Sequence, residues 1–258
     1  MNTQTLTSNE ALAVTPTNPT TQPLTSLVKT ALWALVLLLA PPFILSVFFG
    51  VYYGAQQGEN VNADAFNTWF NTTPILLTLT LLSVFLLLPL LIKATPAKTW
   101  SERFNFWALK PVKRNHAITW LFIGLLYWAI TSFIGLALNL PTENFMLEVK
   151  AAANSLPMLA LVLTTICLVA PISEEVIFRG WLFSKIAQTK LGGTGAIVIS
   201  SLAFTLVHAQ YQQLSTLVMV FALGLLLSWV RYKSNNISYT ILMHMLFNGL
   251  AMASLFLF

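Results

Sequence analysis

The sequence predicts an all-α fold: a polytopic membrane helix bundle with about seven transmembrane helices and its N-terminus inside. Hydrophobic residues make up 57% of the 258 residues and charged residues only 8%, whereas a soluble domain carries about 25% charged residues. The apolar runs are about 20 residues long, the length that a helix needs to cross about 30 Å of hydrocarbon. The alternating pattern of a membrane β-barrel is absent, so the spans are expected to be helices.

Seven apolar runs define the expected spans in chain order. Their approximate bounds are 30–53, 74–92, 117–138, 157–183, 195–211, 214–230 and 237–257. The fifth run is separated from the sixth only by a short stretch rich in glutamine. Prolines inside a span are expected to kink it, and they occur at Pro41, Pro42, Pro89 and Pro171.

Two regions frame the domain prediction. Residues 1–26 are rich in Thr, Asn, Gln and Pro and lack an apolar core, so we expect a disordered cytoplasmic N-terminal tail. Residues 27–258 are expected to form a single transmembrane helical domain, with the candidate catalytic motifs within 157–250. The single cysteine, Cys167, excludes an intramolecular disulfide.

Loop charges predict the orientation. The loop between the second and third spans holds six basic residues against Glu102 alone: Lys93, Lys98, Arg103, Lys110, Lys113 and Arg114. The positive-inside rule makes this loop cytoplasmic, which puts the N-terminus inside and the C-terminus outside. The same rule accounts for the net charge of +5, so the expected partner is the lipid bilayer and no nucleic acid is expected.

The segment A-P-I-S-E-E-V-I-F-R-G, residues 170–180, places three charges inside the fourth span. A charge near the centre of a membrane helix costs about 2.5–3.5 kcal/mol, so such residues are candidates for function. Glu175 and Arg179 are four residues apart on one helix face and can neutralise each other. Glu174 is rotated by about 100° from that face and has no such cation, which makes it the candidate for chemistry.

Other polar residues of the later spans can meet this carboxylate. His208 ends F-T-L-V-H, and His244 opens H-M-L-F-N, which ends at Asn248 one helical turn further on. A lone histidine in a membrane helix often serves only packing through a hydrogen bond. A Glu–His pair, however, can activate water, and a second histidine with an asparagine can donate hydrogen bonds to an oxyanion. Together these are the parts of an amide hydrolase.

Other hydrolase designs fit poorly. An aspartyl dyad needs two aspartates, and Asp64 is the only one in the chain; the motifs H-E-x-x-H and G-x-S-x-G are absent. Cys167 has only apolar and threonine neighbours in the sequence, so we interpret it as a packing residue rather than a nucleophile.

The three motifs E-E-V-I-F-R (174–179), F-T-L-V-H (204–208) and H-M-L-F-N (244–248) resemble, in order and spacing, those of the CAAX protease and bacteriocin-processing family, also called Abi or type II CAAX prenyl endopeptidases. The resemblance covers about residues 155–250. It implies an intramembrane, glutamate-dependent endopeptidase of a bacterial inner membrane that acts on a membrane-associated or lipidated peptide or protein.

Carried over to this chain, the resemblance makes Glu174 the base that activates water and His208 its partner. His244 and Asn248 match the oxyanion-stabilising pair, and Glu175 and Arg179 match the supporting ion pair. No metal cofactor is favoured, because asparagine is an uncommon zinc ligand. The alternative is a zinc ion held by Glu174, His208 and His244.

Two functions from other classes compete with the protease. A member of the same family can act without proteolysis, as a bacteriocin-immunity protein or scaffold. A transporter would also use intramembrane charges, but transporters often have doubled halves, and the sequence shows no repeat.

Overall fold

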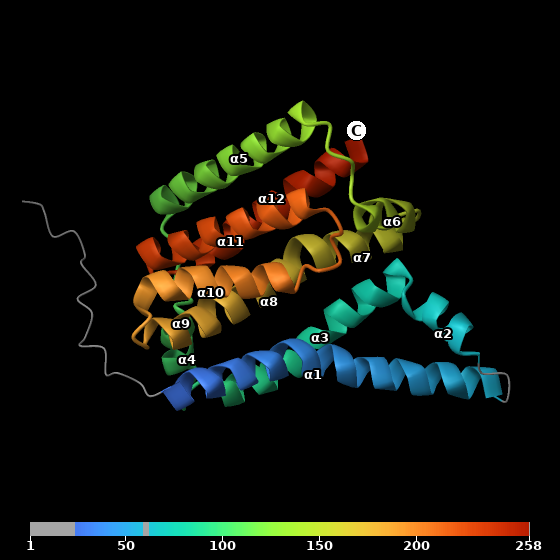
Figure 1. Cartoon of the computed structure of the whole chain (residues 1–258), viewed down its shortest axis with the longest axis horizontal. Coiled ribbons are helices and arrows are strands. Elements are labelled where there is room, and N and C mark those ends of the chain that lie inside the picture. The colour runs from blue at the N-terminus through green and yellow to red at the C-terminus, as the bar shows by residue number, and fades with distance from the viewer. Residues whose placement is uncertain (1–23, 59–61, 258) are drawn as a thin grey trace, which may run out of the picture.

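The computed structural model describes residues 24–58 and 62–257, and within these ranges it contains helices and no strand (Figure 1). The predicted all-α class is therefore confirmed. Residues 1–23 of the predicted tail lie outside the described residues. Helix α1 begins at Leu24, so the last three residues assigned to that tail are helical instead.

Six helices are long and apolar enough to cross a membrane: Ser26–Gln57, Thr73–Ala94, Arg114–Ala137, Leu156–Ala187, Leu214–Ser234 and Ile237–Leu257. They coincide with six of the seven predicted spans, which confirms a polytopic membrane protein. The remaining run forms a shorter helix of 15 residues, Gly192–Leu206, about 22 Å long at 1.5 Å per residue. The seventh crossing, and with it the orientation of the two termini, stays a prediction.

Short helices and one interrupted helix complete the architecture. The bounds in chain order are α1 Leu24–Gln57, α2 Ala63–Phe70, α3 Thr73–Ala94, α4 Trp100–Trp107, α5 Arg114–Ala137, α6 Asn144–Ala152, α7 Leu156–Thr164, η2 Thr165–Val169, α8 Ala170–Glu175, η3 Val176–Leu182, α9 Phe183–Ala187, α10 Gly192–Leu206, α11 Leu214–Ser234 and α12 Ile237–Leu257. The segments from α7 to α9 follow one another without a break, so they form one helix with two π-helical stretches, η2 and η3.

The helices form two groups (Figure 1). Helix α11 lies between α10 and α12, and α5 packs on the outer side of α12. Helices α1 and α3 pack against each other on the opposite side of the interrupted helix. The interrupted helix contacts both groups, so the charges on it lie in the interior of the bundle.

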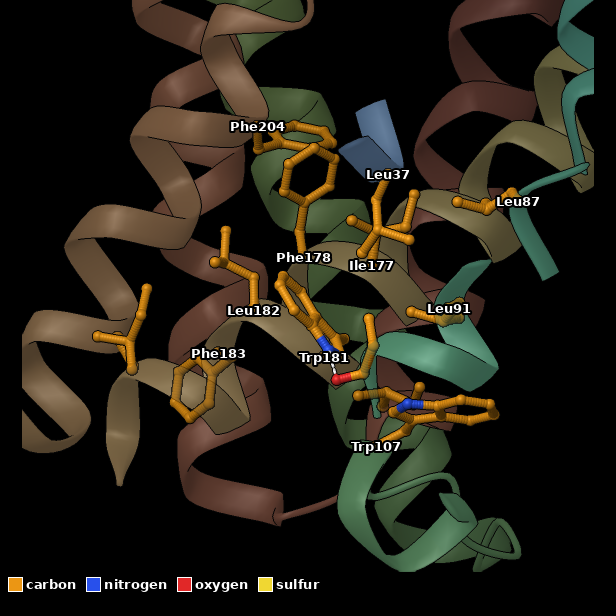
Figure 2. Packing of buried hydrophobic residues seen from close by; sticks show 14 residues of the cluster. Leu37, Leu87, Leu91, Trp107, Ile177, Phe178, Trp181, Leu182, Phe183 and Phe204 are labelled. Carbon is orange, nitrogen blue, oxygen red and sulfur yellow. Dashed lines mark hydrogen bonds between the residues drawn. The ribbon is translucent and has the colours of Figure 1, made fainter. Parts of the chain in front are cut away.

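Buried aromatic residues pack around η3, in the C-terminal half of the interrupted helix (Figure 2). Trp181 is fully buried, and its indole N–H donates to the carbonyl of Ala94 at the end of α3, at 3.1 Å. A Cβ added at Gly180 would lie 3.2 Å from the Cβ of Trp107, so any larger residue here would push α4 and η3 apart by a few tenths of an ångström. These contacts hold η3 in one position, and the residues just before it carry the candidate site.

Candidate active site

The first π-helical stretch, η2, leaves one carbonyl of the interrupted helix without a helical donor. The N–H of Ala170 donates to Thr165 rather than to Ile166, and Pro171 has no N–H. The side-chain amide of Asn248 on α12 donates to the Ile166 carbonyl instead, at 2.9 Å. A π-helical turn in a helix is often found at a functional site, and here it anchors Asn248. The second N–H of this amide is still available to a ligand.

The ion pair expected from the sequence joins Glu175 and Arg179. The Oε1 and Nη1 atoms are 2.9 Å apart, and both side chains are fully buried. Arg179 also donates to the carbonyl of Gly224 at 3.1 Å and to the hydroxyl of Ser228 at 3.3 Å. Its guanidinium lies 4.3 Å from the ring centroid of Phe204. The guanidinium is thus hydrogen-bonded to α11 as well as to its own helix, as a buried cation requires.

His244 lies between the two adjacent carboxylates. Its Nδ1 is 3.0 Å from Oε1 of Glu175, and its Nε2 is 3.8 Å from Oε2 of Glu174. The side chain of Glu175 is fully buried, whereas that of Glu174 is 24% exposed. The 100° rotation between neighbouring helix positions therefore separates a buried, paired carboxylate from an accessible one.

Glu174 faces a cavity of about 390 Å³. The walls come from α3, α6, the interrupted helix, the segment between α10 and α11, and α12. Three of the predicted catalytic residues line it: Glu174, His208 and Asn248. Apolar side chains such as Leu77, Phe145 and Met252 cover much of the remaining wall. The cavity therefore combines a few polar groups with apolar surroundings, as ligand sites usually do.

His208 follows α10 and is held by its neighbours. Its Nδ1 lies 2.7 Å from the carbonyl oxygen of Phe204, and its ring stacks on Tyr211 with centroids 6.0 Å apart and planes at 18°. If Nδ1 carries the proton shared with this carbonyl, Nε2 is left as an acceptor. In the part of the chain that the structure describes, no ion pair joins His208 to Glu174. The histidine near Glu174 is His244, whereas His208 only lines the same cavity as Glu174.

No three His, Cys, Asp or Glu side chains among the described residues are grouped so that they could hold a metal ion. Glu174 and His244 are neighbours, but His208 does not join them as a third ligand. The choice between a metal-free site and zinc stays a prediction.

Three further residues were not singled out in the sequence. Tyr211 lines the cavity and packs on His208; its position three residues after His208 is a signal that could have identified it. The hydroxyl of Ser228 accepts a hydrogen bond from Arg179, and no sequence motif indicates this residue. Thr165 lines the cavity and is buried, and its hydroxyl is one of three buried side-chain atoms without a hydrogen-bond partner in the described chain.

Known proteins resemble the part of the chain that carries this site. Residues 156–250 match the family described as type II CAAX prenyl endopeptidase Rce1-like. An uncharacterized 24.3 kDa protein of Escherichia coli is 37% identical over 136 residues, or 51% of this chain and 61% of that protein. The UPF0177 protein YxdF of Lactococcus lactis is 32% identical over 77 residues, or 30% of this chain and 40% of that protein.

The chain therefore spans less than two thirds of the length of each of these two relatives. No solved structure matches it.

Proposed function

Residues 156–250 match the type II CAAX prenyl endopeptidase Rce1-like family, and on that basis we propose that this protein is an intramembrane, glutamate-dependent endopeptidase. Its substrate is a membrane-associated or lipidated peptide or protein. The observation that carries the proposal is the pair of adjacent carboxylates: Glu175 is buried and bound to Arg179, while Glu174 is accessible on the wall of the cavity.

Glu174 acts as the general base and then as the general acid. Its carboxylate takes a proton from a water molecule while the water oxygen bonds to the carbonyl carbon of the scissile peptide. The same carboxyl then gives this proton to the leaving nitrogen as the C–N bond breaks. The products are a carboxylic acid and an amine, so no other reactant is needed.

Asn248 stabilises the negative charge that develops on the carbonyl oxygen. One N–H of its amide is bonded to Ile166, and the second is the donor for the oxyanion. Its place on the cavity wall, with the amide already fixed by the first bond, supports this role.

The contacts support a different division of work between the two histidines from that implied by the family resemblance. His244 lies between Glu174 and Glu175, which suits a residue that orients the base. His208 lines the cavity, which suits hydrogen bonding to water or substrate through Nε2. In this division Asn248, rather than His244, is the main oxyanion donor.

A comparison of membranes that contain the parent protein or Glu174→Gln tests the proposal without knowledge of the substrate. Glutamine keeps the shape but cannot accept the proton, so cleavage should fall by about two to four orders of magnitude. The measurement is the set of new protein termini by mass spectrometry, with the exposed Glu148→Gln on α6 as the matched control. Identical termini in parent and Glu174→Gln membranes would support the immunity or transport functions instead.

Substitutions of Asn248 separate the metal-free site from a zinc site. An ionised aspartate can only accept hydrogen bonds, so next to an oxyanion Asn248→Asp should be at least as damaging as Asn248→Ala. The alanine variant loses one donor, which costs about 10²–10³ in turnover. A zinc ion would favour the new carboxylate oxygen. If Asn248→Asp cleaves clearly faster than Asn248→Ala, and zinc restores activity lost to a chelator, the oxyanion assignment is wrong.

A further inference from the structure

Glu143, which directly precedes α6, is a buried carboxylate outside the interrupted helix. Its residue is 6% exposed, and the other buried Asp, Glu, Lys or Arg residues in the described ranges are Glu175, Arg179 and Arg231. These three belong to the network around the candidate site. The surroundings of Glu143 are different, because its partners lie in the segment between α10 and α11.

Both carboxylate oxygens of Glu143 accept backbone hydrogen bonds from this segment. Oε2 accepts from the N–H of Gln212 at 3.2 Å, and Oε1 accepts from the N–H of Gln213 at 3.1 Å. The side-chain amide of Gln213 donates back to the carbonyl of Pro141 at 2.9 Å. Three hydrogen bonds therefore fasten the segment that precedes α6 to the start of α11.

A carboxylate suits this position better than a neutral group. Burial opposes its ionisation, but hydrogen bonds from Thr216 and from the amides of Gln212 and Gln213 hold the pKa of Glu143 below its usual range. The negative charge also lies at the N-terminal end of α11, where the helix dipole favours it.

The segment that Glu143 holds is the one that carries His208 and Tyr211. The N–H of Tyr211 donates to the carbonyl of His208 at 3.0 Å, and the two rings are stacked. On its other side, Tyr211 meets the edge of Phe145 from α6, with centroids 6.0 Å apart and planes at 77°. His208, Tyr211 and Phe145 all line the cavity, so the contacts of Glu143 join two of its walls.

We propose that Glu143 is a positioning residue for the hydrolysis: by binding the amides of Gln212 and Gln213 it holds His208 and Tyr211 against the cavity. This role rests on the proposed function. Glu143 itself does not line the cavity, so it acts through the segment that it binds. A misplacement of about 1 Å in a catalytic site can cost about 10²-fold in rate, so loss of these contacts should slow turnover.

Glu143→Gln tests this role with two measurements. Glutamine keeps the length but offers one acceptor and turns an N–H toward the amide donors, so the fastening should weaken. Hydrogen exchange of residues 207–213 should become about tenfold faster. Turnover per folded molecule of a farnesylated peptide with a C-terminal CAAX sequence should fall by about 10-fold to 100-fold. Glu148→Gln, at an exposed glutamate on α6, the helix that follows Glu143, should change neither value.

Two further variants test the same role if Glu143→Gln folds poorly. Glu143→Asp restores the charge on a shorter side chain and should recover part of the lost turnover. Thr216→Val removes one contact to the carboxylate and should shift both measurements in the same direction by less.

Unchanged hydrogen exchange in Glu143→Gln would overturn the inference, and so would faster exchange with unchanged turnover. If the parent protein does not cleave the peptide, this substrate is excluded, and turnover is measured instead as the yield of the new protein termini that Glu174→Gln abolishes; the proposed function fails if there are none. Hydrogen exchange then still decides whether Glu143 holds the segment of His208.

Discussion

Helices α1 and α3 differ from the helices that follow Leu156 in the hydrogen-bond partners of their polar side chains. In α1 and α3, hydroxyl groups donate to carbonyls four residues earlier on their own helix, as in the pairs Thr30–Ser26, Ser46–Pro42, Thr78–Pro74 and Thr80–Leu76. After Leu156, hydroxyl groups such as those of Thr205 and Ser254 also donate to their own helix, but arginine and asparagine side chains bond between helices as well. Arg179 reaches α11, Arg231 donates to the Arg179 carbonyl at 3.0 Å, and Asn248 donates to Ile166.

The difference shows which part of the bundle is fixed by specific contacts. A hydroxyl bonded to its own helix is satisfied in any arrangement of that helix, so it says nothing about the neighbours. A side chain bonded to another helix is satisfied in only one arrangement, and in hydrocarbon the alternative is an unpaired polar group. The interhelical bonds therefore position the candidate site, while α1 and α3 pack mainly through apolar surface.

Among the variants that test this comparison, Arg179→Met should lower the free energy of unfolding most. The substitution leaves Glu175 buried without its cation and removes the bonds to Gly224 and Ser228. Removing one partner of a buried ion pair costs about 3–5 kcal/mol. Thr78→Val on α3 is the matched control and should change the free energy of unfolding by less than about 1 kcal/mol. Unfolding in mixed micelles measures both, and equal effects would remove the distinction between the two regions.

A pair of glycines gives a smaller effect. A Cβ at Gly224 would lie 3.2 Å from the Cβ and 3.3 Å from the Cα of Ser201 on α10, whereas a Cβ at Gly249 on α12 meets nothing within 4 Å. Because backbone cannot move aside, Gly224→Ala should cost about 1–3 kcal/mol. Gly249→Ala should be neutral or stabilise by up to about 1 kcal/mol through helix propensity. Thermal unfolding of the two variants checks the prediction, which a stable Gly224→Ala protein would contradict.

The positions of the helices could largely be predicted from the sequence, because apolar length alone identifies a membrane helix. Helix α10 is the exception in length, since polar residues follow Val207 and the helix ends at Leu206. The separate faces of Glu174 and Glu175 also followed from the helical rotation. These features depend only on spacing along one helix.

The remaining features depend on contacts between helices. The bond from Asn248 to Ile166 requires the π-helical stretch before Pro171, and hydrophobic periodicity does not reveal such a stretch. The position of His244 between two carboxylates requires the packing of α12 on the interrupted helix. The hydrogen bonds of Glu143 join it to two residues that lie 69 and 70 positions further along the chain. No local sequence pattern could indicate them.

The most direct test of the account compares Glu174→Gln with Glu175→Gln, with turnover per folded molecule and free energy of unfolding measured on the same preparations. Glu174→Gln should lose about 10²–10⁴ in turnover and keep the parent's stability to within about 1 kcal/mol. Glu175→Gln leaves Arg179 unpaired and should lose about 3 kcal/mol or more of stability, with most turnover kept in the molecules that fold. Parent-like cleavage by Glu174→Gln, together with a folded but inactive Glu175→Gln, would contradict the assignment of Glu174 as the base.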